Sequence, residues 1–170
     1  MLTWRLPQLF INLKNQYFMI KQISYDLLKK CLDGIGIRTV PDEDGTLLTL
    51  FSADERYGHD VVIRYIVRGP WLHIVGQVPG EKVPEERFED MMMALNLLHV
   101  NGLNATGALH GDSFRFKYSL MIDEEVSEEH VLESGARTGT ESIRNAFVEL
   151  EKLVEDYERN HKRYTLAVIG

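Results

Sequence analysis

The sequence predicts an α+β fold, a two-layer sandwich in which helices pack on an antiparallel sheet of about five strands in the order α-β-β-β-α-β-β-α. Three stretches carry this prediction. Residues 84–100 are apolar on nearly every side, as in a helix that other elements cover. Residues 113–120 alternate strictly between apolar and polar side chains, which is typical of a half-buried strand. Residues 143–157 carry apolar side chains every three or four positions, which predicts an amphipathic helix.

The first half of the chain predicts a helix followed by a meander of strands. Residues 21–33 carry apolar side chains on one face and are followed by Gly34 and Gly36, which allow a left-handed helix cap. A short β-prone stretch over residues 37–40 leads through an acidic turn into three strand candidates, residues 47–51, 61–67 and 71–78. In the strand over 61–67, apolar and arginine side chains lie on opposite faces, so we expect an antiparallel sheet with one face in contact with water.

The stretch over residues 84–120 joins the two halves of the predicted sheet. Pro84 and the two glutamates after it suit the first turn of a helix. Gly102 ends that helix, and residues 106–109 are expected to pair with residues 113–120 across a tight turn. The predicted order is therefore helix, three strands, helix, two strands, helix.

The last third of the chain changes character. Ser127 is expected to cap a short helix, and Gly135 and Gly139 are expected to make a weak point after it. Thr138 and Glu141 then have the spacing of a capping box at the start of the long amphipathic helix. Residues 164–169 are apolar and favour β-structure, so they could add an edge strand or reach a partner subunit.

A length of 170 residues favours one domain with a sizeable core. We divide the chain into an N-terminal extension over residues 1–18, which would be a helix or an arm, a single α+β domain over residues 19–160, and a C-terminal tail over residues 161–170.

The composition is that of an ordinary soluble globular protein, with 44% hydrophobic and 26% charged residues. The 26 acidic residues outnumber the 19 Lys and Arg, and the net charge of −7 opposes binding to nucleic acid; no basic stripe is visible along the chain. The single cysteine, Cys31, rules out an internal disulfide and favours the cytoplasm. No apolar run reaches the roughly 20 residues of a membrane span, and polar residues interrupt the N-terminal apolar run, so we expect neither a membrane segment nor a signal peptide.

Few residues are candidates for chemistry. Cys31 lies on the apolar face of its helix, near the C-terminal end, where a thiolate is disfavoured, so a buried thiol is the better interpretation. Met91, Met92 and Met93 could line an adaptable groove, although core filling is favoured by about three to one. No phosphate-binding glycine loop, zinc-binding motif or calcium-binding motif occurs, so no cofactor and no metal is predicted.

The region between residues 94 and 116 carries a family resemblance. The segments Ala94-Leu95-Asn96-Leu97-Leu98, Gly102, Gly107-Ala108-Leu109, Asp112 and Phe114-Arg115-Phe116 resemble the YbjN-like family. The resemblance extends over roughly residues 23–157 and implies a type III secretion chaperone-like fold that is commonly dimeric. The family is loosely described as bacterial regulators of sensory transduction, and no catalytic residues can be carried over from it.

We favour a non-catalytic protein-binding module, a chaperone-like or regulatory adaptor that forms a homodimer and captures a segment of a partner protein. Capture would occur by β-augmentation at a sheet edge or in an apolar groove beside the helices. The candidate binding residues are Trp71, His73 and Val75, because they share the sheet face opposite Leu72 and Ile74. The alternative is that a helix or the second subunit simply covers that face.

The alternative is a small metal- or ligand-binding enzyme. It would use His59 with Asp60 and His110 with Asp112, which are close pairs of histidine and carboxylate. These two loops would have to meet at one mouth of the sheet and recruit further ligands. A plain turn is the favoured interpretation of each pair.

Overall fold

The computed structural model describes residues 19–20, 22–80, 82–100, 102, 104–122 and 125–169, and the extension expected over residues 1–18 lies outside them. The helices are α1 (Tyr25–Gly34), η1 (Glu85–Arg87), α2 (Phe88–Val100), α3 (Glu128–His130), η2 (Val131–Arg137) and α4 (Thr138–Ile169). The strands are β1 (Met19–Ile20), β2 (Val40–Pro41), β3 (Leu47–Phe51), β4 (Val61–Arg68), β5 (Trp71–Gln77), β6 (Thr106–His110), β7 (Ser113–Met121) and β8 (Val126–Ser127).

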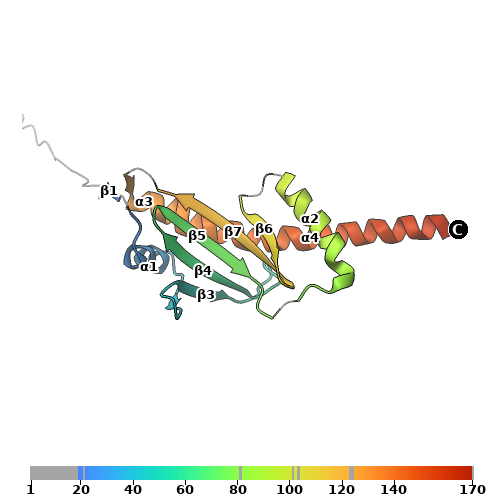
Figure 1. Cartoon of the computed structure of the whole chain (residues 1–170), viewed down its shortest axis with the longest axis horizontal. Helices are drawn as coiled ribbons and strands as arrows, with labels where there is room; N and C mark the ends of the chain where they lie inside the picture. The colour runs from blue at the N-terminus through green and yellow to red at the C-terminus, as the bar shows by residue number, and fades with distance from the viewer. Residues whose placement is uncertain are drawn as a thin grey trace, which may run out of the picture.

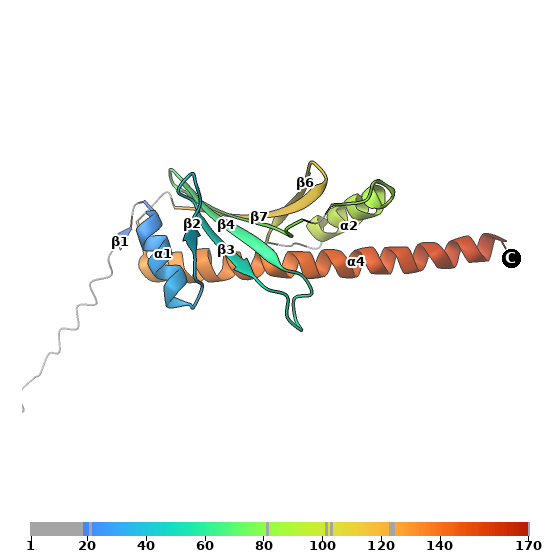
Figure 2. The ribbon, with the colours of Figure 1, turned by 90° about the horizontal axis from the view of Figure 1, so that it is seen from below.

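The main sheet has six antiparallel strands in the order β2-β3-β4-β5-β7-β6, and β1 pairs separately with β8. The sheet stands in front of α4 in Figure 1, and Figure 2 shows α4 along one side of it, with α1 near one end of the sheet and α2 near the other. The predicted α+β class is therefore confirmed. The sixth strand is β2, which keeps only the last residue of the β-prone stretch over 37–40 and extends to Pro41. None of the helices within the described residues is long and apolar enough to cross a bilayer.

The core fills the space between the inner face of the sheet and α4. Ile74 of β5 and Phe116 of β7 are fully buried there. The Phe116 ring meets the Phe147 ring edge to face, with centroids 4.8 Å apart, which is a favourable geometry for an aromatic pair. The buried Tyr65 hydroxyl shares a hydrogen bond of 2.8 Å with the Thr140 hydroxyl, so both of these polar groups are satisfied inside the layer.

Gly135 and Gly139 do not break the helical segment, because α3, η2 and α4 follow one another directly. The segment is nevertheless irregular next to Gly135, since η2 is a π-helix over Val131–Arg137. A Cβ atom at position 139 would collide with Cδ1 of Ile74 and lie 2.8 Å from Cδ1 of Tyr118. A Cβ atom at position 135 would lie 3.0 Å from Cδ2 of Leu72. Glycine lowers helix propensity, but here it lets the helix approach the sheet closely enough to pack against it.

The long helical segment also begins earlier than the capping box implied. The Ser127 hydroxyl accepts a hydrogen bond from the backbone N–H of His130, as expected of an N-cap. Because the helical backbone already starts there, Thr138 needs no cap, and its hydroxyl instead donates to the carbonyl of Glu133 at 2.7 Å. The capping box at Thr138 and Glu141 is thus absent. Residues 164–169, expected to favour an edge strand, are the last part of α4.

Helix α2 is only partly the covered helix that its composition suggested. Its inner side, with Ala94, Leu95 and Leu98, is buried. Met93 and Leu97 are exposed on its other side, and Val100 keeps 82% of its surface in contact with solvent. Apolar residues on every side of a helix therefore did not mean burial on every side, and the helix leaves an apolar surface without cover in the described part of the chain.

Candidate functional site

The two pairs of histidine and carboxylate that could have supported catalysis are held by different neighbours. The His59 ring lies 3.2 Å from a carboxylate oxygen of Glu151 on α4, and Asp60 accepts a hydrogen bond from the backbone N–H of Ala53 at 2.7 Å. Asp112 instead pairs with Lys82 at 2.8 Å, and this ammonium group lowers the pKa of the Asp112 carboxyl.

No hydrogen bond or ion pair joins the His59 loop to the His110 loop among the described residues. That part of the chain also contains no group of three or more histidine, cysteine or acidic side chains placed to hold a metal ion. The described residues therefore do not assemble the constellation that the enzyme hypothesis requires. The buried Cys31 thiol is similarly unsuited to nucleophilic attack, because burial raises its pKa and keeps it protonated.

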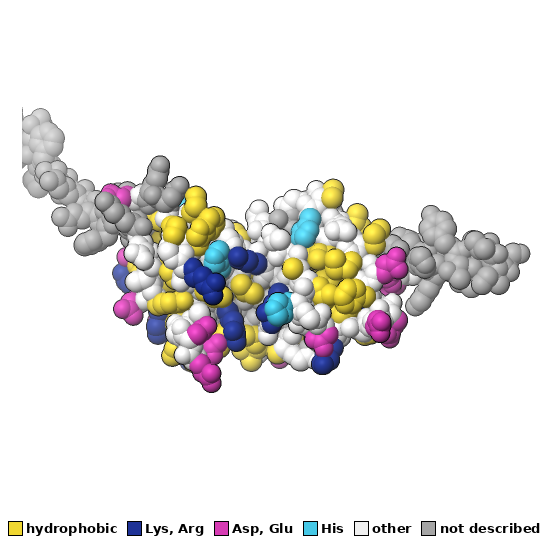
Figure 3. Space-filling model, in the orientation of Figure 1, with side chains coloured by type: hydrophobic (Ala, Val, Ile, Leu, Met, Phe, Trp, Pro, Cys, Tyr) yellow, Lys and Arg dark blue, Asp and Glu magenta, His cyan; other side chains and the backbone are white. Residues whose placement is uncertain are grey.

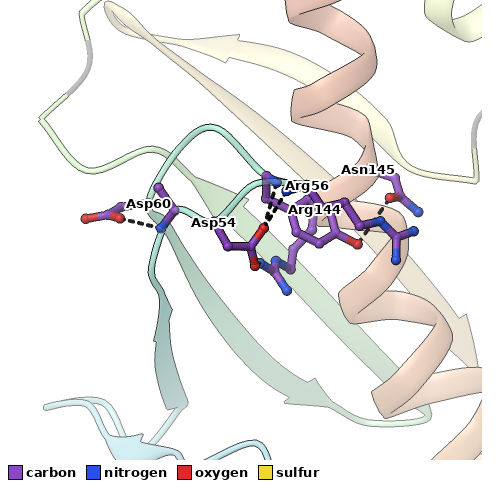
Figure 4. A network of polar contacts seen from close by, with 7 residues as sticks. Asp54, Arg56, Asp60, Arg144 and Asn145 are labelled. Atoms are coloured by element: carbon purple, nitrogen blue, oxygen red, sulfur yellow. Dashed lines mark hydrogen bonds and ion pairs between the residues drawn. The ribbon is translucent and has the colours of Figure 1, made fainter.

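Arg144 of α4 holds the loop that carries His59 against the helix by contacts with Asp54 and Tyr57 (Figure 4). The Arg144 guanidinium lies over the Tyr57 ring, 3.6 Å from its centroid, and 3.3 Å from a carboxylate oxygen of Asp54. The other Asp54 oxygen accepts the backbone N–H groups of Arg56 and Tyr57, and these bonds lower the pKa of its carboxyl. The Tyr57 hydroxyl also donates to Asn145 at 3.3 Å. This polar network positions a loop and has the features of a structural contact.

The outer face of the sheet is the more informative surface. Strand alternation places Trp71, His73 and Val75 on it, opposite the buried Leu72 and Ile74. Helix α4 lies behind the other face (Figures 1 and 2), and no helix of the described residues covers this one. The predicted grouping of the three residues on one face is therefore observed, whereas their role in binding stays a prediction.

Trp71 and His73 form an exposed aromatic pair. Their rings stack nearly parallel, with centroids 5.8 Å apart and an interplanar angle of 11°. The Trp71 side chain is 37% exposed, and His73 is fixed by a hydrogen bond of 2.9 Å between its Nδ1 and the Ser119 hydroxyl. Partial burial and the positive charges of Lys117 and Arg68 lower the pKa of the His73 imidazole. The pair thus presents a neutral aromatic surface at one end of the sheet.

A hollow of about 240 Å³ opens on the same face towards the other end of these strands. Its lining residues are Val62, Arg64, Ile66, Val75, Gln77 and Arg115. The floor is therefore aliphatic, while two arginines stand at its sides. Figure 3 views this face and shows Lys, Arg and His side chains at its centre, with acidic side chains towards its lower border.

The basic character of this face was missed in the sequence, where no basic stripe was visible. Arg64 and Arg68 belong to β4, whereas Arg115 and Lys117 belong to β7. The two strands are far apart along the chain and flank β5 in the sheet. The sequence did contain a signal for this basic face: in each of the two strands, basic residues alternate with buried apolar ones.

A second recess lies beside the helices, where a binding groove was expected from the sequence. It has a volume of about 310 Å³ and lies between α4, the start of α2 and β7. Its lining residues are His59, Arg87, Met91, Phe114, Phe147, Leu150, Glu151, Val154, Glu155 and Glu158. Arg87 and Glu158 form an ion pair of 2.7 Å at this recess.

Comparison with solved structures relates this arrangement of helices and sheet to known proteins. The chain matches the crystal structure of YbjN from E. coli, a candidate transcription regulator, with a TM-score of 0.59 and 14% sequence identity over 81% of this chain and 96% of YbjN. The chain has a YbjN-like fold. The YbjN-like fold that the resemblance implies, and its α+β class, are thereby confirmed at the level of the fold.

A chain of the ExsC-ExsE complex also matches, with a TM-score of 0.41 and 17% identity over 79% of this chain and 90% of that one, a likeness too distant to carry an argument. No protein-family model matches the sequence, and no curated protein matches it either. The YbjN-like fold by itself does not specify an activity, so the function has to be argued from the surfaces described above.

Proposed function

We propose that this YbjN-like chain is a non-catalytic protein-binding module, a chaperone-like or regulatory adaptor, that captures a segment of a partner protein on the outer face of its sheet. The observation that carries the proposal is this face itself, which presents the stacked Trp71 and His73 next to a hollow with an aliphatic floor. An exposed aromatic anchor beside a pocket is the arrangement that supplies most of the affinity in protein interfaces.

The two sheet edges favour binding on the face over strand addition. At one edge, β2 has only two residues, and Pro41 lacks a backbone N–H. At the other edge, the backbone N–H of Gly107 in β6 already donates to the His99 ring of α2 at 3.0 Å. Neither edge presents the uninterrupted row of free backbone groups that β-augmentation uses.

Site-specific photo-crosslinking in the native cells tests this function. Trp71 is replaced with the photoreactive analogue benzoylphenylalanine, which preserves an aromatic side chain. The matched control places the same analogue at Glu129, an exposed position in α3. We expect adducts with another protein at position 71 and none at position 129. Equal labelling at both positions, or no adduct at position 71, would contradict the proposal.

We also propose that the module is a homodimer, because α2 exposes apolar side chains that a second subunit could bury. These side chains belong to Met93, Leu97 and Val100, which lie on one side of the helix. Burying such a patch removes apolar area from water, and this gain drives most stable dimers. Figure 3 shows part of this apolar surface at the end of the molecule that holds α2.

Sedimentation equilibrium checks the dimer. We expect the native chain to sediment with twice its chain mass of 19.6 kDa and Leu97→Glu to sediment at that mass. Leu50→Glu is the control, since Leu50 is also an exposed leucine but lies on β3. A native chain that sediments at the mass of one chain at all concentrations used would refute the dimer.

A further inference from the structure

The outer face of the sheet has a charge opposite to that of the chain as a whole. The chain carries a net charge of −7, yet no aspartate or glutamate occupies an outward position in any of the six strands of the main sheet. Four cationic side chains occupy such positions, namely Arg64, Arg68, Arg115 and Lys117. Lys and Arg side chains gathered on one face of an acidic protein create a positive local potential, which attracts negatively charged groups.

The strand register sets the spacing of these charges. Arg64 and Lys117 stand on either side of Val75, and Arg68 stands beside Trp71. Neighbouring strands lie about 4.8 Å apart, so the backbones that carry the flanking cations are separated by roughly 10 Å, with the apolar residues of β5 between them. The face is thus an apolar track, formed by β5, with a row of cations along each side. We call this surface the cationic track; it consists of Arg64, Arg68, Arg115 and Lys117 together with Trp71 and Val75.

Most of these cations have no acidic partner within the described part of the chain. Arg64 pairs with Asp42 at 3.1 Å, and no ion pair with a described residue involves Arg68, Arg115 or Lys117. Nε of Arg115 is shielded from solvent and has no hydrogen-bond partner there. Side chains of this kind gain most from carboxylates that arrive with a ligand, because a guanidinium can form two parallel hydrogen bonds with one carboxylate.

We propose that the cationic track binds an acidic segment of a partner protein in which aspartate or glutamate side chains alternate with apolar ones. The carboxylates pair with Arg68, Arg115 and Lys117, while the apolar side chains lie on Trp71 and Val75 and enter the adjoining hollow. Charge complementarity selects this occupant over a second copy of the chain bound through the same face, because two cationic faces repel each other. The inference rests on the proposed function and names the chemistry of the captured segment.

Peptide binding to the intact chain tests the inference by fluorescence anisotropy. The probes are three labelled peptides with the same apolar residues, in which the alternating polar positions are all glutamate, all glutamine or all lysine. We expect the glutamate peptide to bind at least about tenfold more tightly than the glutamine peptide, with an affinity that falls as salt is added, and the lysine peptide not to bind. Equal affinities for the three peptides would overturn the proposal.

Matched charge variants locate the site. The double variant Arg68→Gln/Lys117→Gln should lose about tenfold or more in affinity for the glutamate peptide. The control Lys152→Gln/Arg159→Gln removes the same charge from α4 and should bind as the native chain does. Equal losses in both double variants would show that only net charge matters and would refute the site.

A single-stranded oligonucleotide of equal charge is the remaining probe. If it binds more tightly than the glutamate peptide and is released by the same sheet variant, the track is a polyanion site and the inference fails. The photo-crosslinking experiment separates the two proposals: adducts at position 71 with a neutral or basic partner segment would support the binding module and reject its acidic ligand.

Discussion

Replacing Phe116 with alanine is expected to lower the free energy of unfolding by about 3–5 kcal/mol. Phe116 is fully buried at the centre of β7, and its ring contacts the Phe147 ring of α4 edge to face. The substitution removes apolar area that folding takes out of water and leaves a cavity between the sheet and the helix. It also removes an aromatic pair that adds about 0.5–1.5 kcal/mol beyond its area. Urea unfolding followed by circular dichroism measures the loss.

Val40→Ala is the control for this experiment. Val40 is apolar but exposed on β2, away from the α2 surface proposed for the dimer, so its truncation should change the free energy of unfolding by no more than about 0.5 kcal/mol. If Phe116→Ala and Val40→Ala had equal effects, the contact between β7 and α4 would not be the main core of the molecule.

Gly76→Val is expected to lower the free energy of unfolding by about 1–3 kcal/mol, although valine is the better strand residue. A Cβ atom at position 76 would collide with Cγ2 of Ile143 and lie 3.4 Å from Cε2 of Phe147. Both neighbours belong to α4, so the helix would have to move away from the sheet. The difference in strand propensity spans only about 1 kcal/mol, and the packing cost should outweigh it.

A second substitution and a control make this prediction specific. In a background of Ile143→Ala, the added side chain finds space, so the cost of Gly76→Val should fall by about 0.5–3 kcal/mol, the usual coupling between residues in contact. Gly58→Ala is the control, because a Cβ there meets only a carboxylate oxygen of Glu151 at 3.7 Å. Independent effects of the substitutions at 76 and 143 would disprove the contact.

Strands with a regular alternation could be predicted closely from the sequence. The strand expected over 113–120 is β7, and the strand expected over 61–67 is β4, because one face of each is buried and the other is wet. Strands β1 and β8 could not be predicted in this way, because two residues are too few to show an alternation. Whether such a short segment forms a strand depends on which distant part of the backbone lies beside it. The six-stranded order likewise depends on β6 lying outside β7, which only the folded chain decides.

Intrinsic helix and strand propensities gave wrong predictions where tertiary packing or the continuing helix favoured another structure. Gly139 looked like a helix breaker, yet it lies against Ile74 and Tyr118 and lets the helix approach the sheet. The β-prone residues 164–169 continue α4, because a helix already under way adds one hydrogen bond for each further residue. Composition also could not show that one side of α2 is left exposed.

The sequence by itself determined the α+β class, most of the strands and the grouping of Trp71, His73 and Val75 on one face, because side-chain alternation along a strand is a local property. Only the tertiary structure decided that Arg68 and Lys117 flank β5 and that the pairs at His59 and His110 have separate partners. Contacts of this kind join residues distant in the chain, and local patterns do not specify them. The cationic face therefore emerged from the pairing of strands.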